Sequence, residues 1–335
     1  MPLTEYGVLV GRVRDRRREG GKNSPHYQIH VDAAGTQFRV AVNVLSALAP
    51  SELLYTADED FTHPVLPALA TLTDGFTPLT STPGGLALDF IRGNLFDRTT
   101  LRTMPADQPG PDNDLADKLD HYIQHAVGDP AARLYAFGQR WGPETAPDKI
   151  FGFAPGNGIH DIHMNQGNTG RFTADDGVWQ DGALILSFPD RWIAVFLAFQ
   201  SQAWHTDDTT GHTLPGIPPA DPDGHPAPGE PDRQVRIIAA LVNPTGPAPE
   251  AETVTLLNTT ASPIDLTGWT LLDRAQHQAP LPTLTLPAGD TVRLPIPTPL
   301  ALGNQGGALT LLNAAGLKVD GVAYTTAPEG RTLTF

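Results

Sequence analysis

Alternating apolar and polar positions recur along the first two hundred residues and predict mostly short β-strands. Strands are expected at residues 6–13, 27–31, 37–44, 133–137, 149–153, 182–188 and 192–199. The charged stretch 14–24 is typical of a long loop. Asp32-Ala-Ala-Gly35 lies between the second and third expected strands, and its sequence is typical of a hairpin turn. Residues 85–91 are a further candidate for a buried strand.

One segment, residues 112–127, has helical instead of strand periodicity. Its apolar positions fall on one helical face: Leu115, Leu119, Tyr122, Ile123 and Ala126. Asp112 or Asn113 is expected to cap its N-terminus, and Gly128 ends it. One main helix among many strands predicts an α+β domain in which β-structure dominates.

A linker and a second domain follow. Residues 206–233 contain seven prolines, so they are expected to form an extended, acidic linker without a core. Short apolar runs with turn residues between them then recur at 235–242, 254–258, 269–272, 291–295, 308–313 and 319–324. That spacing is typical of an all-β sandwich. The predicted division is therefore 1–205, 206–233 and 234–335.

Composition agrees with two β-rich domains and limits the partners. The 335 residues exceed the usual span of one core, and 33 glycines and 33 prolines favour short strands over long helices. The net charge is −15, with about −11 in residues 41–205, which disfavours broad wrapping of a phosphate backbone. An aromatic content of 7% argues against a nucleic-acid binder built on stacking platforms.

Residues 1–40 differ from the acidic remainder because their net charge is about +3. The basic side chains here could hold one phosphate group or could form a solvated hairpin tip; they are Arg12, Arg14, Arg16, Arg17, Arg18 and Lys22. The chain has no cysteine, so disulfides and thiolate metal sites are excluded. It shows neither a signal peptide nor an apolar run long enough to span a membrane, so a cytoplasmic location is expected.

Two family resemblances emerge from longer motifs. ETVTLLNTTASPIDLTGWTLLD, LPAGDTVRL and LGNQGGALTLLNAAGLKVDGVAY occur in the order typical of a lamin-tail domain, and residues 234–335 resemble that immunoglobulin-like fold. In it Asn258 suits a turn after a central strand, Trp269 after Gly268 should fill the core, Gly306-Gly307 permits a tight hairpin and Asp320 starts the last strands. The resemblance implies a docking module that contacts a protein partner, of a kind that accompanies hydrolases and nucleases in bacteria.

The first domain resembles the YukJ-like bacterial proteins over residues 2–208. The motifs that carry this resemblance include YGVLVGRVRDRR, SPHYQIHV, GLALDFIRGNLFD, RWGPE, GIHDIHMNQGN and FLAFQSQAWHTDD. The resemblance supplies a domain boundary and implies no particular chemistry.

The densest group of chemically capable side chains is Gly158-Ile-His-Asp-Ile-His-Met-Asn-Gln-Gly-Asn168. In an extended chain Asp161, His163 and Asn165 point to one face and His160 to the other, whereas a helical turn would bring His160 and His163 together. Either arrangement could supply part of a metal site. Gly167 and a turn at Gly156-Asn-Gly158 would allow a substrate to approach the backbone. The alternative is a polar turn whose histidines bond to the backbone.

Three smaller groups are also candidates. His26, Gln28 and His30 share one face of a predicted strand, where a solvated hairpin face is the competing interpretation. His205 lies in Trp204-His-Thr-Asp-Asp208 at the end of a strand. Arg92 is spaced to pair with Asp89, either as a substrate contact or as a structural salt bridge. No GxxxxGK[ST], GxGxxG or GxSxG motif is present, so phosphate-binding loops and a serine-hydrolase elbow are not indicated.

These groups lead to two hypotheses. In the first, the protein is a metal-assisted phosphodiesterase or nuclease. His160, Asp161 and His163 would bind Zn²⁺, Mn²⁺ or Mg²⁺, while the side chains expected to orient the substrate are Asn165, Gln166, Asn168 and Arg92. His26, His30, His163 or His205 would then act as general acid or base. In the second, both domains bind a partner without catalysis, as a binding or scaffold protein.

Overall fold

A computed structural model describes residues 5–19, 26–44, 53–79, 102–103, 109–161, 182–199, 234–246, 251–275, 277–314 and 318–335. The chain divides into two compact units, and the second contains Pro228–Phe335. Each unit has its own hydrophobic core. Neither helix among the described residues is long and apolar enough to cross a membrane.

The N-terminal half of the described chain is mostly β-structure. Its elements, in order, are β1 Tyr6–Arg18, β2 His26–Ala33, β3 Thr36–Asn43, β4 Leu53–Asp58, α1 Leu66–Ala70, β5 Gly75–Pro78, β6 Arg102–Thr103, α2 Leu115–Gly128, β7 Arg133–Glu144, β8 Gly156–His160, β9 Gly182–Ser187 and β10 Trp192–Phe199. The ten strands form one sheet in the order β5-β1-β2-β3-β8-β7-β9-β10-β4-β6.

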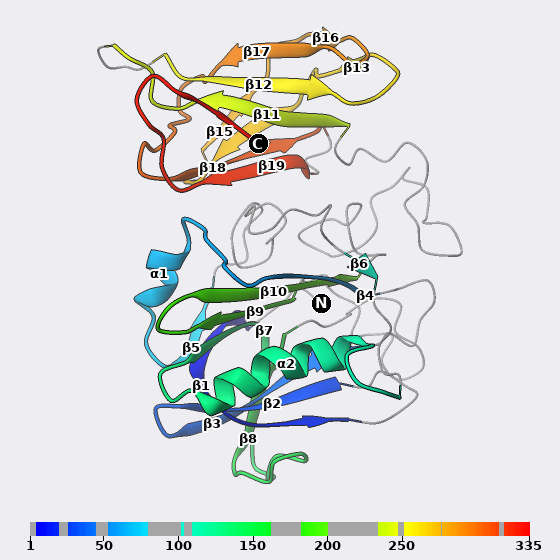
Figure 1. Cartoon of the computed structure of the whole chain (residues 1–335), viewed down its shortest axis with the longest axis vertical. Coiled ribbons are helices and arrows are strands. Elements are labelled where there is room, and N and C mark those ends of the chain that lie inside the picture. Colours follow the sequence, from blue (N-terminus) through cyan, green and yellow to red (C-terminus); the bar gives the residue numbers. More distant parts are fainter. Residues whose placement is uncertain are drawn as a thin grey trace. The chain divides into compact units, whose positions relative to one another are not determined.

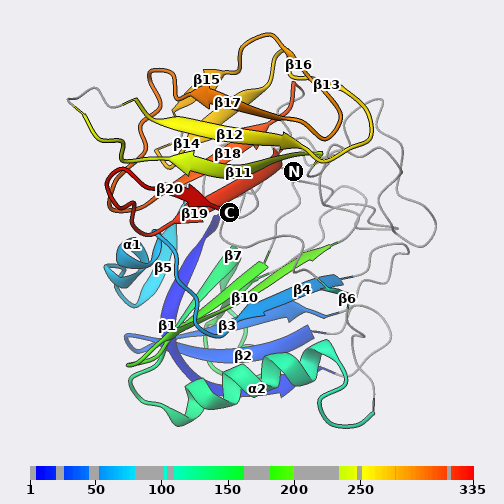
Figure 2. The same ribbon diagram turned by 45° about the horizontal axis from the view of Figure 1, so that its top comes forward.

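Five of these strands close into a barrel, because β1 also pairs with β7. Around the barrel the order is β1-β2-β3-β8-β7, and β3–β8 is its parallel pair. The long, curved β1 pairs with β7 through its first half, up to Gly11, and with β2 through its second, from Arg12, where a register shift follows Val13 (Figure 2). This order, with a helix between the third and fourth barrel strands, is the topology of the OB fold, a Greek-key barrel of five strands.

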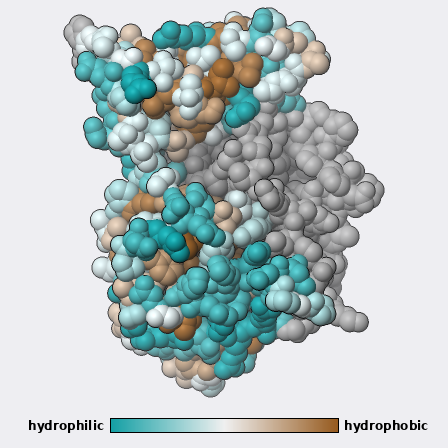
Figure 3. Space-filling view, viewed as in Figure 1, coloured by the Kyte–Doolittle hydropathy of each residue, from teal (hydrophilic) through white to brown (hydrophobic). Residues whose placement is uncertain are grey.

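Helix α2 lies across β1 and β2 and covers the apolar side of the barrel sheet (Figure 1). Its apolar positions are buried against the strands, as the sequence periodicity predicts. Asp114 caps it by accepting a hydrogen bond from the Asp117 amide, so the cap lies one residue beyond the predicted Asn113. The surface over α2 is mainly hydrophilic (Figure 3), which completes an amphipathic helix.

Three local predictions are wrong. Residues 14–18 continue β1 instead of opening a loop. Residues 149–153, expected as a strand, form turns in the loop between β7 and β8, where Asp148 accepts hydrogen bonds from two amides. Gly156-Asn-Gly158, expected as a turn, begins β8. The candidate strand at residues 85–91 lies outside the described residues.

The C-terminal elements form two facing sheets. They are β11 Val235–Leu241, β12 Thr253–Asn258, β13 Ile264–Asp265, β14 Thr270–Asp273, β15 Gln278–Pro280, β16 Thr285–Leu286, β17 Thr291–Pro295, β18 Gly307–Leu312, β19 Lys318–Tyr324 and β20 Thr332–Thr334. One sheet has the order β17-β12-β11-β20 and the other β15-β14-β18-β19, with β13–β16 as a separate pair. Both sheets contribute to one core, which is consistent with an immunoglobulin-like sandwich.

The polar residues singled out in this domain have structural roles. The Asn258 side-chain amide donates hydrogen bonds to the carbonyls of Ser262, Leu286 and Pro287 and so closes the turn after β12. Trp269 is buried in the core. Asp320 accepts a hydrogen bond from the Ile237 amide on the opposite sheet and thereby joins the two sheets.

Candidate functional site

The face of the barrel that does not carry α2 is lined by polar side chains. On β2, Tyr27, Ile29 and Val31 enter the core, so the intervening side chains of His26, Gln28 and His30 point to the other face, as predicted. Arg39 of β3, Trp141 of β7 and His160 of β8 join them through direct contacts. We call this surface, together with Phe151 and Phe153 of the β7–β8 loop, the β2–β3 face.

Arg39 lies at the centre of this face. Its guanidinium donates hydrogen bonds to Asp148 at 2.6 Å and to Gln28 at 2.9 Å, and it lies over the Trp141 ring at 4.6 Å from the centroid. Both ionic partners are buried, with side chains only 8% and 1% exposed. Burial opposes ionisation of Asp148, but amide hydrogen bonds from Phe151 and Ile150 and the Arg39 contact outweigh it and lower its pKa. Arg39 therefore ties the loop to the sheet.

Trp141 lies against β8 because residue 158 is glycine. A Cβ atom at Gly158 would lie 2.2 Å from the Trp141 ring and 2.2 Å from the Arg39 carbonyl oxygen. The ring in turn contacts the edge of His160, with centroids 4.8 Å apart and planes inclined by 63°.

His160 also lies near His26 of β2, with ring centroids 5.8 Å apart. Glu19, just after β1, places a carboxylate oxygen 3.7 Å from Nδ1 of His26 and accepts a hydrogen bond from Gln28. Two histidines from different predicted clusters are thus brought together, beside a carboxylate that the sequence analysis did not single out.

At the other end of the face, planar groups lie on one another. The His30 ring stacks on Phe151 at 4.9 Å and on Phe153 at 5.2 Å, with interplanar angles of 19° and 9°. The Arg17 guanidinium lies 5.2 Å from the Phe151 centroid and donates to the Ile150 carbonyl. These rings are half-buried.

In the part of the chain that the structure describes, three buried side-chain atoms on or beside this face have no hydrogen-bond partner: Nε2 of His30, Oδ1 of Asn43 and Oε1 of Gln139. Asn43 pairs with His26 in the β2–β3 register, and Gln139 pairs with His160 in the β7–β8 register. Because buried polar atoms in folded proteins are normally paired, these atoms are places on this face where hydrogen-bonding capacity is unused.

Asp161 takes no part in this face. It is fully buried where β7 changes partner from β8 to β9, and the amides of Phe137 and Ala183 face its carboxyl group. Complete burial raises the pKa of Asp161 well above its usual value, and the two amides lower it only in part. His160 therefore lies on the β2–β3 face and Asp161 in the interior, as expected for neighbours in an extended chain.

The remaining predicted site residues lie outside the described part of the chain: Arg92, His163, Asn165, Gln166, Asn168 and His205. Within the described ranges, no three His, Asp or Glu side chains are grouped to hold a metal ion. The fold does bring together His26, His30 and His160, which the sequence separates by up to 134 positions.

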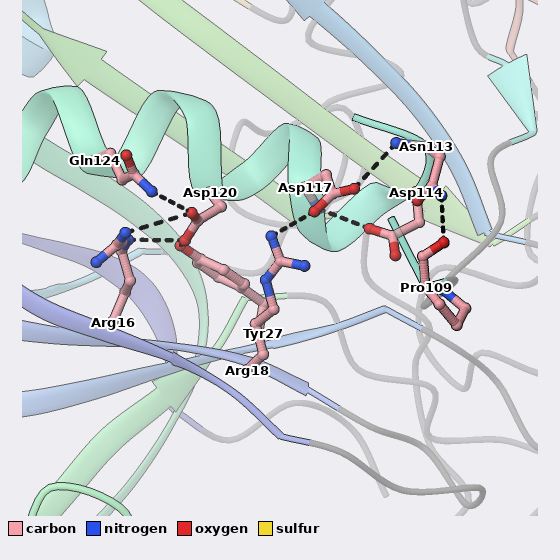
Figure 4. A network of polar contacts seen from close by, with 9 residues as sticks. All are labelled: Arg16, Arg18, Tyr27, Pro109, Asn113, Asp114, Asp117, Asp120 and Gln124. Carbon is pink, nitrogen blue, oxygen red and sulfur yellow. Dashed lines mark hydrogen bonds and ion pairs between the residues drawn. The ribbon is translucent and has the colours of Figure 1, made fainter. Parts of the chain in front are cut away.

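The basic cluster on β1 has mainly structural partners (Figure 4). Arg16 pairs with Asp120 at 2.7 Å and Arg18 with Asp117, and the Tyr27 hydroxyl donates to Asp120 at 2.7 Å. Burial opposes ionisation of Asp120, yet Tyr27 and Arg16 lower its pKa. These contacts attach α2 to the barrel and correct the idea that the cluster is a simple solvated hairpin tip.

Comparisons with known proteins support both sequence resemblances. The family model "Uncharacterized conserved protein (DUF2278)" matches residues 1–211, and the model "Lamin Tail Domain" matches residues 229–326. "Uncharacterized protein YukJ" of Bacillus subtilis (strain 168) is 44% identical over 211 residues, which cover 62% of this chain and 93% of that protein.

Proposed function

The chain belongs to the family described as "Uncharacterized conserved protein (DUF2278)", and we propose that its barrel domain binds single-stranded nucleic acid on the β2–β3 face. One observation supports this proposal most. The face lies on the second and third strands and on the loop between the fourth and fifth strands of an OB-type barrel, which is where OB folds bind oligonucleotides and oligosaccharides. Because a fold alone does not specify a function, the side chains must carry the argument.

Aromatic and cationic planes gather on this face in the manner of a stacking surface. Phe151, Phe153 and Trp141 are half-buried rings, and Arg17 and Arg39 lie over two of them. Bases stack on such groups regardless of their sequence. The low aromatic content of the whole chain does not count against this, because a short stack needs only a few rings on one face.

Hydrogen-bonding capacity and charge also suit a strand of nucleotides. The side-chain amides of Asn43 and Gln139, whose oxygens have no partner among the described residues, would accept hydrogen bonds from base amino groups or sugar hydroxyls once a strand displaced the side chains that cover them. Arg39 is paired with Asp148, and Arg17 lies 3.9 Å from Asp15. Few phosphates would therefore be neutralised, and binding should depend only weakly on salt. An oligosaccharide would share the stacking but would not need the cations.

The proposal is tested by fluorescence polarisation with labelled decamers of single-stranded RNA and DNA, their duplexes, and neutral oligosaccharides as competitors. Phe153→Ala should weaken single-strand binding about 5- to 150-fold, the range expected for one lost base stack. Lys149→Ala, an exposed substitution in the same loop, should change it less than twofold. Duplex binding as tight as single-strand binding, or displacement by oligosaccharides alone, would refute the proposal.

Three further predictions from the sequence accompany this proposal. The C-terminal sandwich would act as a docking module for a protein partner, and the expected location is cytoplasmic. A divalent metal at His160, His163 and Asp161 would have to bind both His160 on the β2–β3 face and the fully buried Asp161. Mass spectrometry of metals in protein purified without chelator tests that hypothesis directly.

A further inference from the structure

We propose that His121 and His125 of α2 bind a divalent transition-metal ion, a function separate from nucleic-acid binding on the β2–β3 face. The two residues are four positions apart in the helix, so their side chains lie on the same helical face, one turn apart. Both are exposed. Their rings already contact each other, with centroids 4.8 Å apart and planes inclined by 65°.

The separation of the two rings matches that of two imidazoles bound to one ion. A bond of about 2.0–2.1 Å from Zn²⁺ to a ring nitrogen puts the centre of that ring about 3.2 Å from the ion. Two such rings at square-planar or tetrahedral angles have centres about 4.5–5.2 Å apart, and the observed 4.8 Å lies within this range. Because both rings are exposed, rotation about χ2 can turn a nitrogen of each toward a shared ion.

The ring nitrogens of this pair are available to a ligand. Among the residues that the structure describes, none forms a hydrogen bond or an ion pair with the imidazole of His121 or His125. The His121 ring meets Tyr122 edge to face, with centroids 5.2 Å apart, and otherwise contacts only His125. By contrast, Nδ1 of His277 lies 2.8 Å from Asp273. A metal ion on α2 would therefore displace no existing polar contact of these two rings.

The helix holds the pair in place before a metal binds. On the adjoining face of α2, Arg16 and Arg18 of β1 pair with two aspartates and fix the helix on the barrel (Figure 4). His125 lies in the last turn, where the carbonyl end of the helix dipole favours a cation. A rigid scaffold lowers the entropic cost of bringing the two imidazoles onto one ion.

The type of ligand determines the class of ion. Imidazole nitrogen suits Cu²⁺, Ni²⁺ and Zn²⁺, whereas Mg²⁺ and Ca²⁺ prefer oxygen ligands. We therefore expect Cu²⁺ to bind more tightly than Ni²⁺ or Zn²⁺, and Mg²⁺ not to compete. Two protein ligands leave the other coordination positions to water, so this site is open, unlike the closed four-ligand sites of structural zinc domains.

The test is calorimetric titration of the full, tag-free chain with Cu²⁺ and with Zn²⁺, followed by electron paramagnetic resonance of the Cu²⁺ form. The expected result is one equivalent of ion that His121→Ala and His125→Ala both lose, with coupling of Cu²⁺ to two imidazole nitrogens. Each variant should weaken this binding about 100-fold or more, because the second imidazole binds as an intramolecular ligand. Saturating Zn²⁺ should raise the thermal unfolding temperature of the unsubstituted chain and of neither variant.

His125→Ala/Val127→His is the matched control. It keeps the number of histidines but places them six residues apart, on different faces of the helix, and residue 127 is exposed. It should bind no better than His125→Ala, and tight binding by this control would overturn the two-histidine chelate. Equal stoichiometry and affinity in the unsubstituted chain and both alanine variants would also overturn the proposal.

The same variants separate this proposal from nucleic-acid binding. Because α2 covers the opposite side of the barrel sheet from the β2–β3 face, binding of labelled decamers should change less than about twofold in all of them. Loss of the metal with intact oligonucleotide binding is the expected result. Absence of oligonucleotide binding would refute the function proposed for the barrel and leave the metal site on α2 standing.

Discussion

The ion pair between Arg39 and Asp148 should be the most sensitive electrostatic contact on the β2–β3 face. Arg39→Met retains much of the side-chain volume but removes the cation from a carboxylate whose side chain is 1% exposed. Breaking a buried pair on one side typically costs about 3–5 kcal/mol. Asp148 keeps the amides of Ile150 and Phe151, so we expect a value near the lower end, about 3 kcal/mol.

Urea unfolding followed by circular dichroism and tryptophan fluorescence measures this loss. With a slope of about 2 kcal/mol per molar urea, the midpoint of the barrel transition should fall by about 1.5 M. The double variant Arg39→Met/Asp148→Asn removes the stranded charge and keeps acceptors for the two amides, so it should recover more than half of the loss. If the midpoint falls by less than about 0.5 M, or if the double variant is no more stable than the single one, the pair does not anchor the loop.

Three other predictions concern separate parts of the molecule. The pKa of Asp117 is lowered, first by the Asn113 amide and then by Arg18. The ionised carboxylate therefore stabilises the fold above its ordinary pKa, and this stabilisation is lost as pH falls below about 4. Asp117→Asn should flatten the acid limb of a pH–stability curve. Asp320→Ala leaves the Ile237 amide without its acceptor and should cost the sandwich about 1–3 kcal/mol in calorimetry. Gly158→Ala should displace Trp141, seen as a shifted emission maximum together with weaker oligonucleotide binding.

Periodicity predicted most of the regular structure because burial on one side imposes it. Helix α2 and the strands β2, β3, β17 and β19 lie close to the segments expected from apolar spacing. The failures occur where a partner distant in sequence overrides the local signal. Residues 14–18 carry four arginines and suggest a solvated loop, yet they extend β1 because alternate arginines find Asp117 and Asp120 on α2.

The closed barrel could not be inferred from the sequence for a related reason. Strand patterns give the number and positions of strands, whereas closure depends on which strands pair. Here the ring requires β1 to change partners after Gly11 and β8 to lie parallel to β3. Neither feature leaves a local pattern of polar and apolar residues, so the OB topology emerges only from the pairing.

The candidate site also depends on strand pairing that leaves no local pattern in the sequence. The cluster beginning at His160 was visible because polar residues are dense there, but density did not separate His160, on the β2–β3 face, from Asp161, buried at the junction of β8 and β9. His26 was visible as one of three polar residues on a strand face, whereas Glu19 carried no signal beyond ordinary polarity. On β3, Ala41 lies opposite Gln28 and His160, and Asn43 lies opposite His26, so the approach of the two histidines depends on strand order and register. A substitution such as Ala41→Leu, which enlarges the side chain opposite His160 without removing a polar group, therefore separates the arrangement of the β2–β3 face from the identity of its polar residues.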